Sequence, residues 1–455
     1  MKIGLIKPSM GKIIGERYVR SWSMEPLEIA VLSALTPDEH DVSFIDDRFE
    51  DIDFDADYDL VAIPVETYTA KRAYRISEKF QQRGVRTAMG GIHASLCPDE
   101  VISNADHVLI GGAEQNWQIF LDDLVLGRAQ QTYKEISKKG LPQVLPDRQI
   151  LRGRNYLPLQ MVETGRGCPF TCEFCAINGA FNGRYSTKEI DSIVEDIAST
   201  DRKFLYFVDD NFVSQPRRTI QLCKEIAPLK KKWFSHGSIT MTHNDELMSS
   251  LAESGCSNIL IGFESLNPNV LEAMGKSWNV AKHEYDESLK RLRDHGITVY
   301  GTFVFGYDQD TPDVFEKTLD FALEQKLCLA AFNHLVPFPG TALYERFKKE
   351  NRLLMDDWWV NDQYRFGEVA FKPTSMEPTE LAERCFDLRK RFYSYSNIGR
   401  RFLDKANAAN FGQAAAYLIS NLTSHSGVVE RQYWPVGEVL RREEFEEKHD
   451  GKVQR

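Results

Sequence analysis

The stretch GRGCPFTCEFC, residues 165–175, places three of the chain's eight cysteines in one short segment. Their spacing is Cys-x3-Cys-x2-Cys, so Cys168, Cys172 and Cys175 share a single loop. The remaining cysteines are isolated in the sequence, as is typical of small buried side chains in a reducing compartment. They are Cys97, Cys223, Cys256, Cys328 and Cys385. The clustered cysteines are therefore predicted to bind a metal centre.

The number of thiols in this segment favours an iron-sulfur cluster over zinc. A structural zinc ion is held by four protein ligands, and no fourth cysteine or histidine lies nearby in the sequence. Three thiolates suit a 4Fe-4S cluster whose fourth iron stays open to a substrate or cofactor. Phe170 and Phe174 would shield such a cluster from water. Structural zinc with a distant fourth ligand remains the less favoured alternative.

On the C-terminal side of the cysteine segment, strand and helix patterns alternate. Apolar runs such as KFLYFVDD, NILIGFES and TVYGTFVFG are separated by amphipathic stretches such as NDELMSSLAESG. Six such units predict a partial (β/α)6 barrel of the TIM type over residues 156–350, with the cysteines directly after its first strand. Functional residues are then expected at the carboxyl ends of the strands.

On the N-terminal side, residues 1–135 show the same alternation. Runs such as KIGLI, DVSFID and DLVAIPV predict a doubly wound, Rossmann-like parallel sheet, so the chain as a whole is α/β. Two strands end in the glycine pairs Gly90–Gly91 and Gly111–Gly112. Such pairs allow close approach of a ligand or simply turn the chain, and the pattern alone does not separate the two.

The boundaries of these regions follow from composition. Residues 136–155 are polar, rich in charge and weakly periodic, and they predict a surface linker. Residues 351–455 predict a mainly helical C-terminal domain. Aromatic residues gather in this domain, where they would close over a flat or lipid-like substrate or form the domain's own core. They are Trp358, Trp359, Tyr364 and Phe366.

Bulk composition excludes several classes of protein. A formal net charge of -11 over 455 residues argues against a nucleic-acid-binding protein, which needs a basic face. Every apolar run is far shorter than the roughly 20 residues that cross a bilayer. The N-terminus MKIGLIKPSMGK reads as a strand and lacks the features of a signal peptide. We expect a cytoplasmic protein that acts on a small molecule.

The motifs together resemble the radical S-adenosylmethionine (SAM) enzymes that carry a cobalamin-binding-type domain. The segments TGRGCPFTCEFC, YFVDDNF, IGFES, GTFVFG and PFPGTALYE carry the resemblance, which covers about residues 1–390. It implies a 4Fe-4S cluster that cleaves SAM to a 5'-deoxyadenosyl radical, with an electron from a reductant such as flavodoxin or ferredoxin. The family includes cobalamin-dependent C-methyltransferases and the anaerobic cyclase of magnesium-protoporphyrin ester.

The resemblance also implies SAM contacts along the barrel. Asp210 and Asn211 stand in VDDNF, where many members have Gly-Gly-Glu for the methionine amino group, so this motif departs from the pattern. Asp210 could still face the ammonium, whereas a helix cap is the alternative role. Glu264 is expected to contact the ribose. The other implied positions are Phe174 and the glycines Gly301 and Gly306 for adenine, and Ser238 for the methionine carboxylate or ribose.

For cobalamin, the resemblance implies contacts from loops at the carboxyl end of the N-terminal sheet. These are Gly90, Gly91, Gly111, Gly112 and Glu114. Many cobalamin domains have Asp-x-His-x-x-Gly after the first strand, but this chain has KPSMGK at residues 7–12 and no histidine there. His93 lies on another loop, where a surface or capping role is expected. Cobalamin is therefore expected without a histidine ligand to cobalt.

Three functions remain open at this point. The favoured one is cobalamin-dependent C-methylation of a biosynthetic intermediate. The second is a radical cyclisation, rearrangement or carbon–carbon bond formation in which the N-terminal domain has lost cobalamin. The third is a non-catalytic iron-sulfur protein, which would not convert SAM to 5'-deoxyadenosine.

Overall fold

The computed structural model describes residues 1–135, 140–279, 282–403 and 407–447. The chain divides into two compact units, which are both discontinuous in sequence. Unit 1 comprises residues 1–157, 355–367 and 431–455, and unit 2 comprises residues 158–354 and 368–430. The C-terminal region from residue 351 is thus shared between the units, and much of the segment 136–155 belongs to unit 1. Residues 136–139 of that segment lie outside the described residues.

Unit 1 is built on a six-stranded, fully parallel sheet with the order β3-β1-β4-β5-β6-β7. Its strands are β1 (Lys2–Lys7), β3 (Asp41–Asp46), β4 (Leu60–Pro64), β5 (Arg86–Gly90), β6 (His107–Ile110) and β7 (Thr132–Lys134). The order reverses between β1 and β4, so their carboxyl ends flank the switch point of a doubly wound sheet. The two central strands β1 and β4 are almost continuously apolar because both of their faces are buried.

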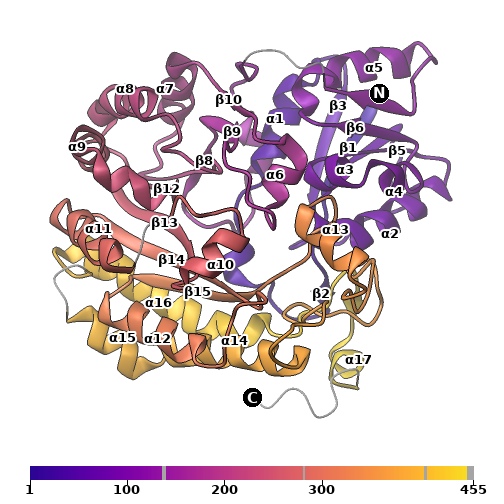
Figure 1. Cartoon of the computed structure of the whole chain (residues 1–455). Coiled ribbons are helices and arrows are strands. Elements are labelled where there is room, and N and C mark those ends of the chain that lie inside the picture. Colours follow the sequence, from indigo (N-terminus) through magenta and orange to yellow (C-terminus); the bar gives the residue numbers. More distant parts are fainter. Residues whose placement is uncertain (136–139, 280–281, 404–406, 448–455) are drawn as a thin grey trace. The chain divides into compact units, whose positions relative to one another are not determined.

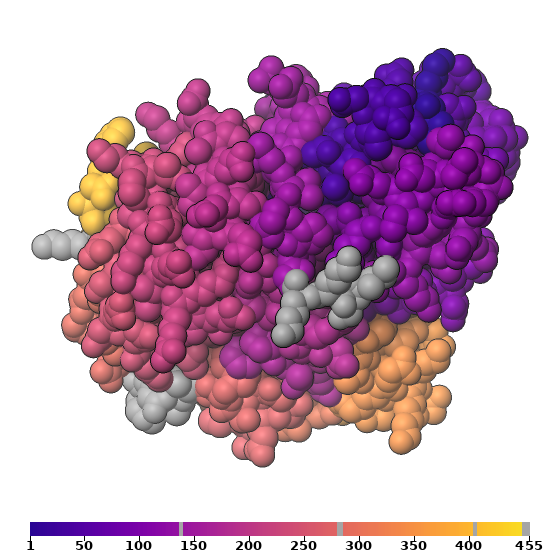
Figure 2. Space-filling model, turned by 90° about the horizontal axis from the view of Figure 1, so that it is seen from above, coloured from indigo at the N-terminus to yellow at the C-terminus, as the bar shows by residue number. Residues whose placement is uncertain are grey.

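Five helices accompany this sheet (Figure 1). They are α1 (Leu27–Leu35), α2 (Ala70–Gln81), α3 (Ile92–Leu96), α4 (Pro98–Ile102) and α5 (Trp117–Val125). Side chains of α1 and α5 share one core with alternate residues of the strands, such as Leu5 and Ala62. Figure 2 shows the close-packed surface of this N-terminal segment in indigo to purple. Later in the chain, β16 (Val439–Leu440) returns to unit 1 and pairs in parallel with β2 (Lys12–Ile13).

Unit 2 contains a second six-stranded parallel sheet, with the order β15-β14-β13-β12-β11-β8. Its strands are β8 (Gln160–Val162), β11 (Phe204–Phe207), β12 (Lys232–Gly237), β13 (Cys256–Glu264), β14 (Thr298–Phe305) and β15 (Leu329–His334). Spatial order follows chain order, and within the described residues β8 and β15 form its two edges. This is the expected arrangement of a partial barrel, in which every strand ends at the same rim.

Helices on the outside of this sheet bury its apolar residues in one large core. Those between the strands are α7 (Ile190–Ala198), α8 (Pro216–Ile226), α9 (Asp245–Glu253), α10 (Pro268–Ala273), α11 (Lys282–Asp294) and α12 (Val314–Glu324). After β15 come α13 (Ala342–Lys349), α14 (Pro378–Phe392), α15 (Tyr395–Phe402) and α16 (Phe411–Arg431), and α17 (Arg442–Glu447) follows in unit 1. Figure 1 shows α7, α8 and α9 on one side of the strands. Within the described residues, no helix has the length and apolar character needed to span a bilayer.

Candidate active site

The three clustered cysteines lie in the loop between β9 (Gly165–Gly167) and α6 (Ala176–Phe181), just after the first strand of unit 2. The strand β9 pairs with β10 (Tyr185–Thr187), which closes the base of this loop. Gly167 has φ +89°, and a Cβ at this position would lie 2.1 Å from the carbonyl oxygen of Arg184. Only glycine allows this close approach, so Gly167 fixes the start of the cysteine loop.

Two of the three sulfur atoms in the loop, those of Cys168 and Cys175, receive N–H donors. The side-chain amide of Asn211 points its Nδ2 at Cys168 Sγ across 4.0 Å, and the backbone N–H of Phe170 also donates to this thiol. Cys175 receives the backbone N–H groups of Ile177 and Asn178. Such N–H to sulfur bonds stabilise and tune cluster thiolates. The donor set therefore fits a 4Fe-4S cluster.

The same geometry does not favour a single metal ion at these cysteines. Three ligands of a single ion would lie close together. Within the described part of the chain, the three potential ligand atoms that lie within 4.8 Å of one another belong to a group in unit 1 and not to the cysteine loop. Burial raises the pKa of all three thiols, to about 11 for Cys172. A bound cluster would hold them as thiolates against this cost.

At the end of β11, the two aspartates of VDDNF anchor the cysteine loop. Asp209 is fully buried and accepts hydrogen bonds from the N–H and the hydroxyl of Thr164, at 2.8 and 2.6 Å. Asp210 accepts the backbone N–H of Gly167 at 2.8 Å. Burial raises the pKa of Asp209 to about 7 and that of Asp210 to about 6. Asp210 is therefore mostly ionised at neutral pH and has further acceptor capacity for an ammonium group.

Glu264, at the end of β13, stands in a strained and buried position. Its φ is +61°, which is unusual for a residue with a side chain and is found mainly where surrounding structure enforces it. Lys276 donates to the Glu264 carboxylate at 2.7 Å and to the carbonyl of Gly262 at 2.8 Å. The two charges also act electrostatically on Cys172, which places them beside the cysteine loop.

Lys276 and Trp278 are residues of this site that the sequence did not single out. The Lys276 ammonium lies 5.2 Å from the centroid of the Trp278 ring, and this ring stacks on Phe170 at 3.9 Å. Phe170 thus shields the loop as part of an aromatic pair. The signal in the sequence was weak, because a lysine and a tryptophan in AMGKSW carry no motif.

The other expected SAM contacts are explained by the chain's own packing. Ser238 Oγ lies 3.0 Å from Thr240 Oγ1. A Cβ at Gly301 would lie 2.7 Å from a methyl carbon of Leu327. Gly306 has φ +109°, and a Cβ there would lie 2.8 Å from a methyl carbon of Leu381. Phe174 is half-buried and packs against the core of unit 2. Their roles toward SAM stay predictions.

A further polar pair lies on the sheet face opposite to the helices. Tyr206 OH and His236 Nε2 are 2.7 Å apart, and the Tyr206 ring stacks on Phe234 at 4.5 Å. The neighbours of Tyr206 in β11 are fully buried in the core, so Tyr206 points to the inner face of the partial barrel. Burial lowers the pKa of His236 to about 4, which keeps its ring neutral at physiological pH.

In unit 1, one glycine of each pair at the carboxyl end of the sheet is required by a positive φ and a close contact. Gly91 has φ +100°, and a Cβ there would lie 2.8 Å from the carbonyl oxygen of Val65. Gly111 has φ +84°, and its Cβ would meet the side chain of Glu135 at 2.7 Å. The carboxylate of Glu135 also accepts the N–H of Gly112 at 3.1 Å. These contacts account for the turning role of the pairs and leave a ligand role untested.

Two other cobalamin expectations concern this edge of the sheet. Glu114 lies in the short helix η3 (Ala113–Gln115), and Gly90 ends β5. The expectation that His93 is a surface or capping residue is wrong, because its side chain is fully buried. Its two ring nitrogens lie 3.2 Å from the hydroxyl of Thr67 and from the Glu100 carboxylate. Thr67 lies 26 positions from His93 in the sequence, so periodicity could not reveal this contact.

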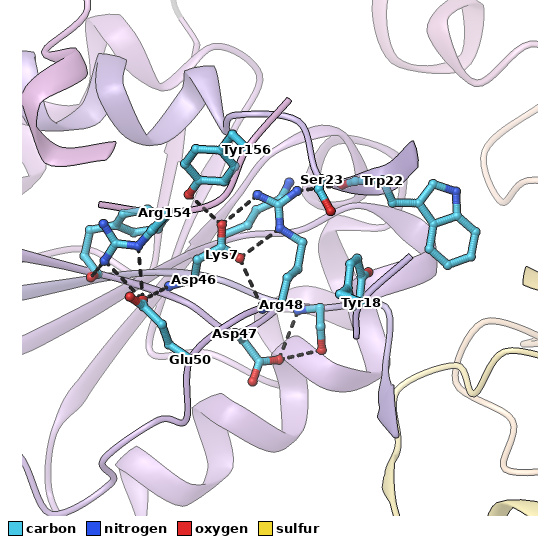
Figure 3. Close-up of polar contacts among 12 residues, drawn as sticks. Lys7, Tyr18, Trp22, Ser23, Asp46, Asp47, Arg48, Glu50, Arg154 and Tyr156 are labelled. Atoms are coloured by element: carbon cyan, nitrogen blue, oxygen red, sulfur yellow. Dashed lines mark hydrogen bonds and ion pairs between the residues drawn. The ribbon is translucent and has the colours of Figure 1, made fainter. Parts of the chain in front are cut away.

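The loop after β1, where many cobalamin domains have a histidine, is held by hydrogen bonds to Asp47, which is labelled in Figure 3. Ser9 donates its N–H and its hydroxyl to Asp47, at 3.0 and 2.6 Å. Arg72 forms a bidentate pair with the same carboxylate. Nearby, Arg48 pairs with Asp46. The loop therefore offers no histidine to cobalt, and cobalamin would fit only without such a ligand.

Known proteins resemble this chain in sequence and in fold. The family described as the Radical SAM superfamily matches residues 162–322, and a domain of unknown function (DUF4070) matches residues 341–437. The bacteriochlorophyllide d C-12(1)-methyltransferase of Chlorobaculum tepidum is 29% identical over 394 residues, covering 84% of this chain and 85% of the relative. The anaerobic magnesium-protoporphyrin IX monomethyl ester cyclase of Cereibacter sphaeroides is 24% identical over 373 residues, covering 73% of this chain and 59% of the relative.

A solved structure shares the fold across both units. It is the radical S-adenosylmethionine methyltransferase TsrM from Kitasatospora setae, with cobalamin and a [4Fe-4S] cluster bound. Its TM-score is 0.62 at 15% sequence identity, and the match covers 94% of this chain and 98% of TsrM. The predicted α/β fold class is thereby confirmed. The barrel region of this chain thus matches the Radical SAM superfamily, and the chain resembles radical SAM methyltransferases over most of its length.

Proposed function

We propose that this enzyme is a cobalamin-dependent C-methyltransferase that acts on a small biosynthetic intermediate and is reduced by a flavodoxin or ferredoxin. The observation that carries the proposal is the loop of Cys168, Cys172 and Cys175. The sulfurs of Cys168 and Cys175 receive N–H donors, and three thiolates would leave one iron of a 4Fe-4S cluster without a protein ligand. Support for methyl transfer comes from the bacteriochlorophyllide methyltransferase, which matches over most of both chains.

When bound, the cluster would supply the electron that cleaves SAM, and cobalamin would carry the methyl group. We assign the cluster to the three cysteines and the methionine ammonium of SAM to Asp210, which lies beside the loop and is mostly ionised at neutral pH. Asn211 orients Cys168. Lys276 holds the Glu264 carboxylate in place for the ribose hydroxyls.

Each of the remaining assigned residues is expected to contact one of the two cofactors. For SAM these are Phe174, Ser238, Gly301 and Gly306, and for cobalamin Gly90, Gly91, Gly111, Gly112 and Glu114. Because the loop after β1 contains no histidine, cobalamin would be held there without a histidine ligand to cobalt. The aromatic inner face with Tyr206 and Phe234 suits an apolar, flat substrate.

The test is a reconstitution under anaerobic conditions with iron, sulfide and hydroxocobalamin. We expect bound cobalamin by its visible absorption. With substrate and SAM labelled in the methyl group, both S-adenosylhomocysteine and 5'-deoxyadenosine should form, and the label should appear on a carbon of the product. Formation of 5'-deoxyadenosine by protein that binds no cobalamin would contradict methyl transfer. That result would support the alternative of a radical cyclisation, which is consistent with the match to the anaerobic cyclase.

A further inference from the structure

A second set of metal-ligating side chains lies in unit 1, on the short helices α3 and α4 after β5. His93, Cys97 and Glu100 each offer one ligand atom, and these atoms lie within 4.8 Å of one another. We propose that these three side chains bind a divalent metal ion of the zinc class. This site is separate from the cysteine loop and does not depend on the proposed function.

The three ligands suit zinc by their chemistry. One imidazole nitrogen, one thiolate sulfur and one carboxylate oxygen form a mixed set of borderline softness, which zinc accepts more readily than magnesium or calcium do. A thiolate and a carboxylate together balance the charge of a divalent ion. Three protein ligands leave one tetrahedral position, which water can fill because the Glu100 side chain is 29% exposed.

The spacing of the ligands also fits a tetrahedral ion. His93 Nε2 and Glu100 Oε1 lie 3.2 Å apart. Two ligands with bonds of about 2.0–2.1 Å to one tetrahedral zinc ion are separated by about 3.3 Å. His93 lies in α3 and Glu100 in α4, and Cys97 is the non-helical residue between the two helices, so the break between the helices brings the three side chains together. The pair therefore needs little movement to become a pair of ligands.

Surrounding hydrogen bonds hold His93 and Glu100 in place. Thr67 Oγ1 lies 3.2 Å from His93 Nδ1, the ring nitrogen that faces away from the site. Glu100 accepts the hydroxyl of Tyr74 at 2.6 Å and the indole N–H of Trp359 at 3.0 Å. Metal-binding histidines and carboxylates are usually oriented by such outer contacts. His93 is fully buried, so its ring has no alternative contact with water.

Ion binding requires a simple rearrangement of protons. Without the ion, the N–H at Nε2 of His93 donates to Glu100. With the ion, Nε2 becomes a ligand, the ring proton moves to Nδ1 and is donated to Thr67, and the thiol of Cys97 releases its proton to water. One proton leaves per ion bound, and no redox change is involved.

The site would fasten a remote segment of unit 1. Trp359 belongs to residues 355–367 and donates to Glu100, and Asp362 of the same segment pairs with Lys71 of α2 at 2.7 Å. An ion that fixes Glu100 would therefore also stabilise the contact between this segment and the sheet.

The test uses the full chain with Cys168, Cys172 and Cys175 replaced by alanine, so that cluster thiols cannot compete for metal. Titration with Co2+ should give one bound ion per chain with a thiolate-to-cobalt absorption band, and Zn2+ should displace it. In this background Cys97→Ser should abolish the band, and His93→Gln should weaken binding by at least about tenfold. Cys223→Ser is the matched control, because Cys223 is a buried cysteine remote from the triad in sequence.

Two results would overturn the proposal. One is a cluster-free parent chain that is folded by circular dichroism and gives no thiolate band. The other is a band that survives in Cys97→Ser with unchanged affinity. Either result leaves the proposed methyl transfer untouched, because that function is measured on the chain with its cluster.

Discussion

Replacing Lys276 with methionine should greatly increase the frequency of local opening at the end of β13. The Lys276 and Glu264 side chains are only 8% and 10% exposed, so the substitution leaves a buried carboxylate without its cation. Methionine keeps the apolar stem of lysine, and the carbonyl of Gly262 still accepts Asn279 Nδ2 at 3.3 Å. The loss is therefore dominated by the unpaired charge of Glu264.

Removal of one partner of a buried ion pair costs about 3–5 kcal/mol. Because 1.4 kcal/mol is a factor of ten, local opening at Glu264 should become about a hundredfold to a few thousandfold more frequent. Hydrogen–deuterium exchange of the peptide that contains Gly262 and Glu264 measures this opening directly. Lys290→Met is the matched control, because the Lys290–Asp294 pair is exposed to solvent and should contribute little to stability.

The double variant Lys276→Met with Glu264→Gln separates the ion pair from other effects. With both charges removed, most of the lost protection should return, because a buried pair replaced on both sides is often nearly neutral. The reasoning is refuted if exchange in Lys276→Met is no faster than in Lys290→Met. It is also refuted if the double variant exchanges as fast as the single one.

Three further predictions concern the cysteine loop. Alanine at any one of the three clustered cysteines should abolish both the brown colour of the cluster and the formation of 5'-deoxyadenosine, whereas Cys223→Ala should keep both. Gly167→Ala should lower the iron content, because its Cβ would collide with a backbone carbonyl; Gly296→Ala, at a φ of +71° with open space around it, should cost only about 1 kcal/mol and keep the iron. Burial raises the pKa of Asp209 to about 7, compared with about 3.9 in an unfolded chain, so the contribution of Asp209 to stability declines as pH rises from about 4 to 7. The variant Asp209→Asn should remove that decline. Urea unfolding of the variant and the wild type across this pH range measures the difference.

Much of the fold could be predicted because its strands carry a simple signal. Strands buried on both faces, such as β4, are continuous apolar runs, and the strands of unit 2 alternate with amphipathic helices. The cysteine spacing located the cluster loop for the same reason, since all its ligands are local in sequence. The strand β7 was missed because it has three residues and only one of them is buried.

The remaining features depend on contacts between distant segments. The left-handed backbone of Glu264 and its pairing with Lys276 arise from packing at the rim of the sheet, and no local pattern encodes them. The burial of His93 depends on Thr67 and on Trp359, which lie 26 and 266 positions away. The aromatic residues Trp358 and Tyr364 form a cluster with Tyr68 in unit 1, so they build core rather than a separate helical domain.

The return of residues 431–447 to unit 1 sets the order in which the molecule can be assembled on the ribosome. The strand β2 cannot pair until β16 has been synthesised. The ring of Trp434 packs against Tyr18 and Trp22, and its indole N–H donates to the carbonyl of Gly11. During synthesis, the first unit therefore stays incomplete, with aromatic side chains uncovered, until residues 431–447 have emerged. Fragments that stop before Trp434 should be trapped by chaperones or aggregate, even though their N-terminal sheet is complete.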